Sequence, residues 1–189
     1  MEKKVLVFLA NGFEEVEAVT PIDYLRRAGV RVVLAAIGPE TAVTGARGIV
    51  LKADTTIGAL ETPETLSPDG WDAVFVPGGM PGASNLAACA PAGNFFRAMA
   101  KAGKITAAIC ASPAVFLAPL GLLEGKRFTC YPGMEKGLTG GTWTEEKVVS
   151  DGNLITSRAP GTAVDFALAL VEKLAGGGEA KKLRAAALL

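Results

Sequence analysis

Residues 104–113 read KITAAICASP, and this stretch decides the fold class that we expect. The apolar run that ends at Ile109 is typical of a buried strand, and Cys110 follows it directly, between small residues. Pro113 is tolerated in the first turn of a helix. Small residues around a nucleophile at a strand-to-helix junction indicate a sharp, strained turn, as in the serine elbow of α/β-hydrolases. The stretch therefore predicts an α/β sheet with Cys110 at the carboxyl end of a strand.

The rest of the chain alternates strand patterns with helix patterns. Strands are expected at residues 4–10, 30–37, 73–76, 104–109 and 127–130, with hairpins around 43–51 and over 147–157, and helices at 14–28, 95–101, directly after Cys110, and at 162–175 and 179–189. Pro21 should bend or locally break the first helix, and the glycines at 176–178 should form a hinge. This alternation predicts a mostly parallel sheet, helices on both of its faces, and a single domain over residues 1–189.

The composition of the chain argues against several classes of function, namely nucleic-acid binding, membrane binding and secretion. Lys+Arg and Asp+Glu number 19 each, so net charge draws the chain neither to nucleic acid nor to an anionic membrane. The first apolar run is short and continues into Asn11-Gly12 rather than a cleavage site, so we expect a strand there and not a signal peptide. No segment approaches the length needed to span a bilayer. The chain is therefore expected to be cytoplasmic, with no membrane partner and no specific nucleic-acid site.

The three cysteines and the lack of histidine restrict the chemistry further. Cys89, Cys110 and Cys130 are odd in number and lack metal-ligand spacing, so we expect neither a disulfide framework nor a metal site. The sequence contains no histidine, which excludes an ordinary Ser-His-Asp or Cys-His catalytic pair. Any chemistry must use thiol, carboxylate, backbone dipoles, tyrosine or arginine.

Cys110 is the candidate nucleophile. Backbone N–H groups and the positive end of a helix dipole would favour its thiolate. The alternative is a buried cysteine that acts as a small hydrophobic residue, which is how we interpret Cys89 and Cys130.

Two other loops follow buried strands and reach the same edge of the expected sheet. Pro77-Gly78-Gly79 offers backbone N–H groups that could bind an oxyanion, although the same residues suit a plain tight turn. Residues 11–17 place three carboxylates in one helical turn, where they complement the helix dipole. Glu17 shares a face with Glu14, and a carboxylic acid held beside the thiol could move protons without histidine.

In this order, the three loops resemble those of the DJ-1/ThiJ/PfpI superfamily, in its short single-domain DJ-1 branch. The resemblance covers nearly the whole chain and is most specific at residues 11–23, 26–29, 76–82, 107–113 and 156–162. It implies a flavodoxin-like three-layer sandwich without a cofactor. It also implies a homodimer, with the first helix and the hairpin near Val50 at its interface.

The resemblance also implies roles for particular residues. Cys110 matches the oxidisable nucleophile and Glu17 the carboxylic acid beside its sulfur. The remaining matches are backbone positions around the site (Gly78, Gly79 and Ala111), arginines of an anion-accepting entrance (Arg27 and Arg47), and the loop beside the site (Ser157, Arg158 and Pro160). Arg27 also has a simpler interpretation as a cation at a helix C-terminus.

One departure concerns histidine. Many relatives carry a histidine directly after the cysteine or about twenty residues later, whereas here Ala111 and Tyr131 occupy these positions. Peptidase activity is therefore disfavoured, and Tyr131 is left as a candidate for orienting a substrate carbonyl.

The resemblance implies a cysteine-dependent activity on methylglyoxal or glyoxal, or on their protein or nucleotide adducts, with release of lactate or glycolate. The alternative is a redox sensor or holdase chaperone that uses oxidation of Cys110 without turnover. No Gly-rich Lys motif supports a thiazole-pathway kinase.

Overall fold

The computed structural model describes residues 2–60 and 66–189; residues 1 and 61–65, which belong to the domain predicted over 1–189, lie outside the described residues. The strands are β1 (Lys4–Leu9), β2 (Arg31–Ala36), β3 (Ala42–Thr44), β4 (Val50–Lys52), β5 (Thr55–Thr56), β6 (Ala73–Val76), β7 (Ile105–Ile109), β8 (Arg127–Phe128), β9 (Thr142–Trp143), β10 (Val148–Asp151) and β11 (Leu154–Ser157). The helices are α1 (Glu15–Arg27), α2 (Ile57–Leu60), α3 (Gly82–Ala88), α4 (Ala90–Lys101), α5 (Ala163–Ala175) and α6 (Gly177–Ala186).

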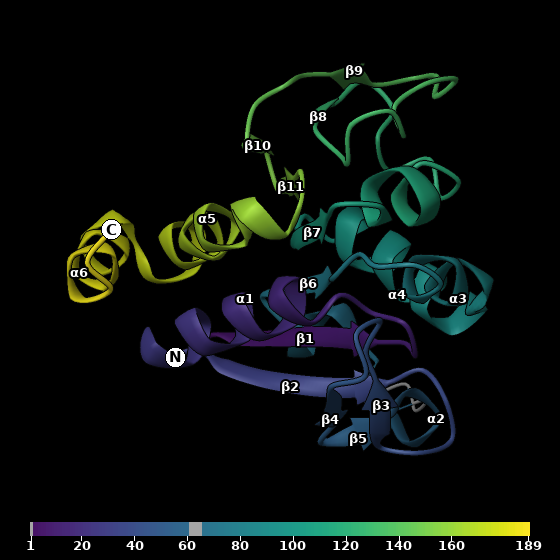
Figure 1. Cartoon of the computed structure of the whole chain (residues 1–189), viewed down its shortest axis with the longest axis horizontal. Coiled ribbons are helices and arrows are strands. Elements are labelled where there is room, and N and C mark those ends of the chain that lie inside the picture. The colour runs from purple at the N-terminus through teal and green to yellow at the C-terminus, as the bar shows by residue number, and fades with distance from the viewer. Residues whose placement is uncertain (1, 61–65) are drawn as a thin grey trace.

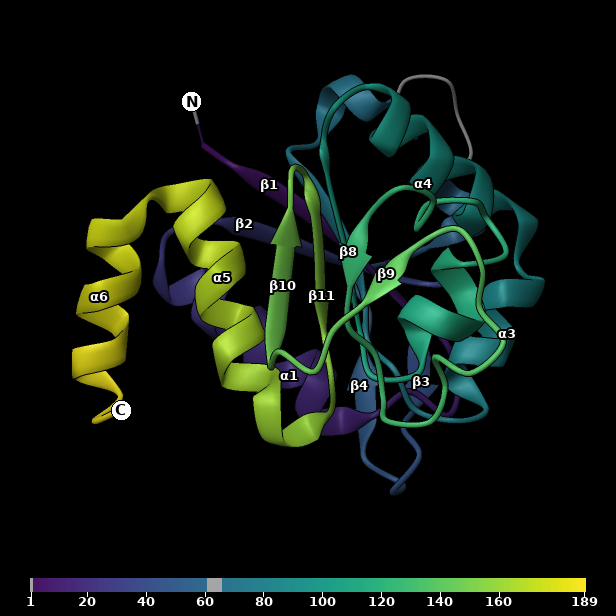
Figure 2. The same ribbon diagram turned by 90° about the horizontal axis from the view of Figure 1, so that it is seen from above.

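A mostly parallel sheet forms the centre of the molecule. Within the described residues it has seven strands in the order β10-β11-β7-β6-β1-β2-β5. Neighbouring strands run parallel except in the β10–β11 hairpin. Helices α1 and α5 lie on one face and α3 and α4 on the other, with α6 outside α5 (Figures 1 and 2). The predicted α/β class, with helices on both faces of the sheet, is confirmed.

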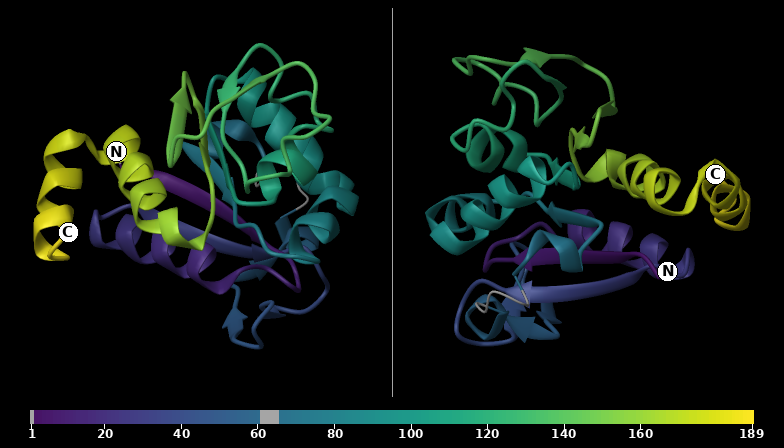
Figure 3. Two further views of the ribbon diagram at one scale, coloured as in Figure 1. Left: turned by 45° about the horizontal axis from the view of Figure 1, so that its top comes forward. Right: turned by 180° about the vertical axis from the view of Figure 1, so that it is seen from behind.

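The core consists of two apolar layers, one on each face of the sheet. Along β1, Val5 and Val7 belong to the layer under α1 and α5, whereas Leu6 and Phe8 belong to the layer under α3 and α4. A strand that is buried on both faces needs a continuous apolar run. This requirement explains why residues 4–10 do not alternate between apolar and polar side chains. The N-terminus and α6 lie at the same end of the molecule in both views of Figure 3.

Two helix irregularities that the sequence predicts, at Pro21 and at the glycines 176–178, differ in the structure. Helix α1 continues through Pro21 without a break. Pro21 is buried in α1, which packs against α5, so tertiary packing offsets the backbone hydrogen bond that proline lacks. The glycine hinge is shorter than expected, because Gly176 takes the left-handed conformation at φ 93° and α6 begins at Gly177.

Some helices and strands also begin or end at residues other than those predicted. Helix α4 begins at Ala90 rather than at residue 95, and the helix after Cys110 is a single π-helical turn over Pro113–Leu117. The strand predicted at 127–130 shrinks to β8, which pairs with β9 outside the main sheet. Within the described residues, no helix has both the length and the apolarity that crossing a bilayer requires.

Candidate active site

Cys110 lies at a strained turn directly after β7. Its φ is 64°, a left-handed conformation that residues other than glycine rarely adopt. Two backbone hydrogen bonds hold it there: the Cys110 N–H donates to the carbonyl of Ser157 at 2.9 Å, and its carbonyl accepts from the N–H of Tyr131 at 2.8 Å. The residue is 8% exposed, so the thiol is nearly buried but not sealed. The sharp turn predicted around Cys110 is confirmed.

The turn is joined to the glycine-rich loop after β6. The Ser112 hydroxyl is buried and donates to the carbonyl of Pro77 at 2.6 Å. A buried hydrogen bond of this kind is costly to leave unmade, so it fixes the two loops relative to each other. The loops therefore form one rigid unit around Cys110.

The carboxyl group of Glu17 lies between these two loops. The Glu17 residue is fully buried, and its Oε2 accepts a hydrogen bond from the N–H of Gly78 at 2.8 Å. A Cβ on Gly78 would lie 2.7 Å from both the Cβ of Cys110 and Oε2 of Glu17. Only glycine therefore lets the three groups approach this closely.

The pKa of Glu17 is raised from an ordinary value of 4.5 to about 7, chiefly by burial and also by the neighbouring charge of Glu14. Hydrogen bonding to Cys110 and Gly78 opposes the shift. Glu17 Oε1 is buried and makes no hydrogen bond of standard geometry within the described residues, which favours the protonated form. Glu17 therefore changes charge near neutral pH, as a general acid or base requires.

The resting state of Cys110 differs from the sequence-based expectation. Burial raises the pKa of its thiol above the ordinary value, and the negative charge and hydrogen bond of Glu17 raise it further. The N–H groups of Ala111 and Gly79 favour the thiolate, as expected of the turn, but they are outweighed. The dipoles of the turn therefore do not make a thiolate by themselves, and the thiol proton needs an acceptor.

The two expected oxyanion donors also have different roles. The Gly78 N–H is occupied by Glu17 Oε2, whereas the amides of Gly79 and Ala111 hydrogen-bond the Cys110 sulfur. Gly79 has a φ of 88°, and a Cβ there would lie 2.4 Å from the backbone nitrogen of Glu14. Gly79 and Ala111 thus surround the Cys110 sulfur, and Gly78 positions the Glu17 carboxyl group.

The first turn of α1 completes this arrangement. Glu14 caps the helix by accepting from the N–H of Glu17 at 2.8 Å, and its own N–H donates to the carbonyl of Gly78 at 2.9 Å. The Glu14 carboxylate therefore caps the N-terminus of α1. The sequence predicts this kind of role for the carboxylates of residues 11–17.

Comparison with known proteins agrees with this geometry. The sequence profile described as the DJ-1/PfpI family matches residues 3–173. The chain belongs to the DJ-1/PfpI family. Protein DJ-1 homolog A of Arabidopsis thaliana is 41% identical over 98% of this chain, which spans only 46% of that relative. The chain spans 41% of the length of DJ-1 homolog B from the same plant. It therefore covers less than half of the length of each of these two relatives.

Two further DJ-1/PfpI proteins bear on the site. Glutathione-independent glyoxalase DJR-1.2 of Caenorhabditis elegans is 34% identical, with 93% of this chain and 90% of that relative covered. The structure of oxidized Toxoplasma gondii DJ-1 superimposes with a TM-score of 0.90 at 39% identity, covering 98% of each chain. The flavodoxin-like fold that the resemblance implied is thereby confirmed.

Among the predicted entrance residues of this DJ-1/PfpI protein, the two arginines lie far apart. Arg27 is ten residues beyond Glu17 on α1, or about 15 Å along the helix axis. It pairs with Asp23 at 2.7 Å and lies beside α6, so within one chain it is not part of the Cys110 site. Arg47 is exposed on the loop after β3, and that loop is anchored to the segment before α1: the Ala46 N–H donates to the carbonyl of Phe13 at 2.7 Å.

The loop beside the site divides into structural and exposed residues. The Ser157 hydroxyl is buried and bonds the carbonyl of Lys147 at 2.8 Å and the Thr162 hydroxyl at 2.7 Å, so it is not placed to bind substrate. Arg158 donates to the carbonyl of Glu145 at 2.9 Å, and half-buried Pro160 begins a 3₁₀ turn. Tyr131 is 48% exposed and remains available at the surface.

Two functional neighbours escaped the sequence analysis. Ser112 was interpreted only as one of the small residues around Cys110, and Glu15 only as one of the three carboxylates that complement the helix dipole. Glu15 is instead buried, and its Oε1 accepts from the N–H groups of Arg47 at 2.6 Å and Ile49 at 3.4 Å. No local pattern signals this role, because the contact joins residues 32 positions apart in the chain.

The other cysteines stay outside the site. Cys130 is buried, and burial raises the pKa of its thiol to about 11; Cys89 is half-buried. Within the described residues, no three His, Cys, Asp or Glu side chains gather where they could hold a metal ion.

Proposed function

We propose that this DJ-1/PfpI protein is a cofactor-free enzyme that uses Cys110 to convert methylglyoxal or glyoxal, or their adducts with proteins and nucleotides, to lactate or glycolate. The observation that carries the proposal is the pairing of a strained, nearly buried thiol with a carboxyl group that titrates near pH 7. The C. elegans relative that is named a glyoxalase supports this substrate class.

The first step uses Glu17 as the proton acceptor for Cys110. As the sulfur attacks the aldehyde carbon of methylglyoxal, a C–S bond forms and the thiol proton moves to the Glu17 carboxylate. The carbonyl electron pair becomes an alkoxide, which the N–H groups of Gly79 and Ala111 stabilise. Glu17 then returns its proton to this oxygen, and the product is a hemithioacetal.

The second step transfers hydrogen between the two carbons of the substrate. Glu17 removes the proton from the former aldehyde carbon and delivers it to the adjacent carbonyl oxygen, which gives an enediol. Glu17 then takes the hydroxyl proton of the former aldehyde carbon and delivers it to the adjacent carbon. The result is a lactoyl thioester on Cys110. Water hydrolyses this thioester, releases lactate and restores the thiol. One carbon is oxidised as its neighbour is reduced, so no external oxidant or reductant is needed.

Exposed groups around the site provide the substrate contacts in this proposal. Tyr131 and Arg158 lie on the loops that flank the turn, and Arg47 lies on the loop after β3, which Glu15 joins to the start of α1. On a glycated amine or thiol, the same attack by Cys110 would release the free amine or thiol. Histidine is not required, because Glu17 both accepts and donates the proton.

The test measures lactate formed from methylglyoxal by the purified chain. We expect kcat/KM to rise as pH increases through about 7, because the carboxylate form of Glu17 must accept the thiol proton. Cys110→Ala and Glu17→Gln should each lower kcat/KM by at least about 100-fold. Cys89→Ala, a half-buried thiol outside the site, is the matched control and should retain turnover. Full lactate formation in Cys110→Ala would refute the mechanism.

A second candidate function is redox sensing or holdase chaperone activity through oxidation of Cys110. The structure of the oxidized T. gondii relative favours testing it. The amides of Gly79 and Ala111 are placed to bind oxygen added to the sulfur. If the purified chain forms no lactate but mild peroxide converts Cys110 to the sulfinic acid, this function replaces the enzymatic one.

A further inference from the structure

A pocket lies at the opposite end of the strands from Cys110. Its volume is about 570 Å³, within the range of small-molecule sites. Lys4 and Arg31, which line it, are the first residues of β1 and β2, whereas Cys110 follows the last residue of β7. Because these strands are parallel, their first residues and Cys110 lie at opposite edges of the sheet.

Two cations enter this pocket from neighbouring strands. Lys4 and Arg31 are directly opposite each other in the β1–β2 register and lie on the same face as Leu6 and Ala35. Like charges placed opposite each other on neighbouring strands are destabilising. Neither side chain forms an ion pair with another residue in the described part of the chain. An anion between them would remove this repulsion.

Within the described residues, the two carboxylates near these cations, those of Asp72 and Asp54, have other partners. Asp72 pairs with Lys3 at 2.9 Å and accepts from the Lys4 backbone N–H at 2.9 Å. Asp54, at the far side of the pocket, accepts from the N–H of Leu34 at 2.8 Å and lies 3.9 Å from Arg26. The positive charge of Lys4 and Arg31 is therefore not balanced by either acid.

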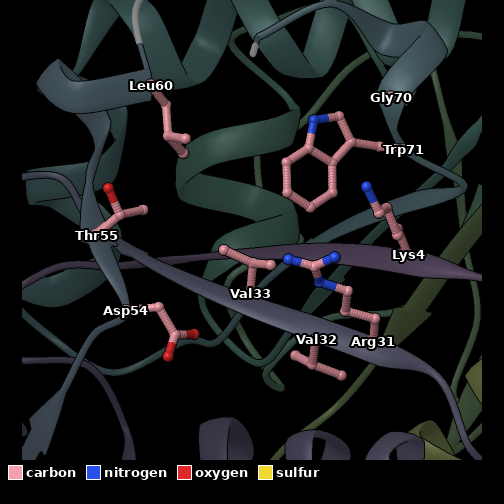
Figure 4. Close-up of a pocket in the computed structure, with 9 residues that line it drawn as sticks. All are labelled: Lys4, Arg31, Val32, Val33, Asp54, Thr55, Leu60, Gly70 and Trp71. Atoms are coloured by element: carbon pink, nitrogen blue, oxygen red, sulfur yellow. The ribbon is translucent and has the colours of Figure 1, made fainter.

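Most of the remaining wall is apolar, although Asp54 and Thr55 also line the pocket. The Trp71 ring, Val33 and Leu60 surround the space that the Lys4 ammonium and the Arg31 guanidinium enter (Figure 4). A charged end beside an apolar, partly aromatic wall is complementary to a compound with one anionic group on a flat apolar body.

We propose that this pocket, bounded by Lys4, Arg31, Val33, Leu60 and Trp71, binds a small aromatic anion that carries a carboxylate or a phosphate. Lys4 and Arg31 would hold the anionic group, with Arg31 able to donate two hydrogen bonds from its planar guanidinium. The site is separate from the chemistry proposed for Cys110, and it does not depend on that proposal.

The test uses phenyl phosphate as the probe and the fluorescence of Trp71 as the readout. Trp143→Phe removes the other tryptophan, so any change reports on the pocket. We expect phenyl phosphate to change the emission saturably, and benzyl alcohol, its uncharged counterpart, to have no effect at the same concentration. Arg31→Gln and Lys4→Gln should each raise Kd about tenfold, the usual effect of losing one charged hydrogen bond.

Matched controls locate the bound anion. Lys173→Gln removes an exposed cation from α5, on the other face of the sheet, and should leave Kd unchanged. Cys110→Ala should also leave it unchanged, which separates this result from the turnover test. The proposal is overturned if phenyl phosphate produces no saturable change or if Arg31→Gln and Lys4→Gln bind as tightly as Lys173→Gln. It is also overturned if binding is lost in Arg47→Gln alone, which would place the anion near Cys110.

Discussion

At the scale of single residues, reactivity depends on how Glu17 and Cys110 share their protons. Both groups are buried, and both are more easily protonated than they would be in water. Losing one proton from the pair is easier than losing two, because the second would leave two negative charges in contact. Near neutral pH the pair therefore holds one or two protons, and Glu17 is the group that accepts the thiol proton during attack.

The same pKa shift predicts how stability changes with pH. The pKa of Glu17 is about 7 in the folded protein against an ordinary 4.5, so between these values the folded state binds more protons than the unfolded state. The free energy of unfolding should therefore fall as pH rises from 5 to 8, by about 2.5 kcal/mol from this residue. Denaturant unfolding at both pH values measures it.

Glu17→Gln cannot titrate and should lose this part of the pH dependence. Glu40→Gln, at an exposed position, should behave like the wild type. If Glu17→Gln lost stability between pH 5 and 8 as steeply as the wild type, Glu17 would not be the titrating group.

At the scale of elements, the site depends on loops that buried polar groups hold together. The loop over residues 45–49 is fixed by Glu15, whose Oε1 accepts from the N–H groups of Arg47 and Ile49. A Cβ on Gly45 would lie 2.4 Å from the same oxygen, so the loop passes very close to the carboxylate. Glu15 thus positions the backbone that carries Arg47.

Removing the Glu15 carboxylate should release this loop. Glu15→Ala leaves two N–H groups without their acceptor and should cost about 2–4 kcal/mol of unfolding free energy. Hydrogen exchange at the amides of Arg47 and Ile49 should accelerate. Glu15→Gln retains one acceptor oxygen and should lose less stability. Unchanged exchange of both amides in Glu15→Ala would contradict the positioning role.

At the scale of the whole molecule, one exposed apolar patch spans two elements. It consists of Val16 and Val19 on α1 together with Ile49 and Val50 on the hairpin, each between 43% and 56% exposed. The two elements meet where Glu15 of α1 accepts from the N–H of Ile49, and exposed apolar residues gathered in this way are typical of protein interfaces. It coincides with the helix and hairpin that the family resemblance implied for a homodimer, and we propose that two copies of the chain associate through it.

A charge in the centre of this patch should prevent association. We expect the wild type to sediment at twice the mass of one chain, and Val19→Glu with Val50→Glu to sediment as a monomer. Leu189→Glu alters an exposed apolar residue at the C-terminus, outside the patch, and should remain dimeric. A wild-type chain that sediments as a monomer at micromolar concentration would refute the interface.

Local sequence determined most of the elements and the position of Cys110 at a sharp turn. The apolar runs at residues 4–10 and 104–109 specify strands that are buried on both faces, and the small residues around Cys110 specify a sharp turn. These features involve neighbours along the chain, so backbone sterics and hydrophobic periodicity were enough to predict them. The continuation of α1 through Pro21 was not predictable in this way, because it depends on packing against α5.

Only the tertiary structure decided how the groups of the site are paired. The Gly78 N–H bonds Glu17, 61 residues away in the chain, and is therefore not an oxyanion donor. Burial of the pair raises the pKa of Cys110 where local dipoles predicted a thiolate, and the length of α1 keeps Arg27 away from Glu17. These outcomes depend on desolvation and on contacts between distant segments, which exist only after the sheet has brought the three loops to one edge.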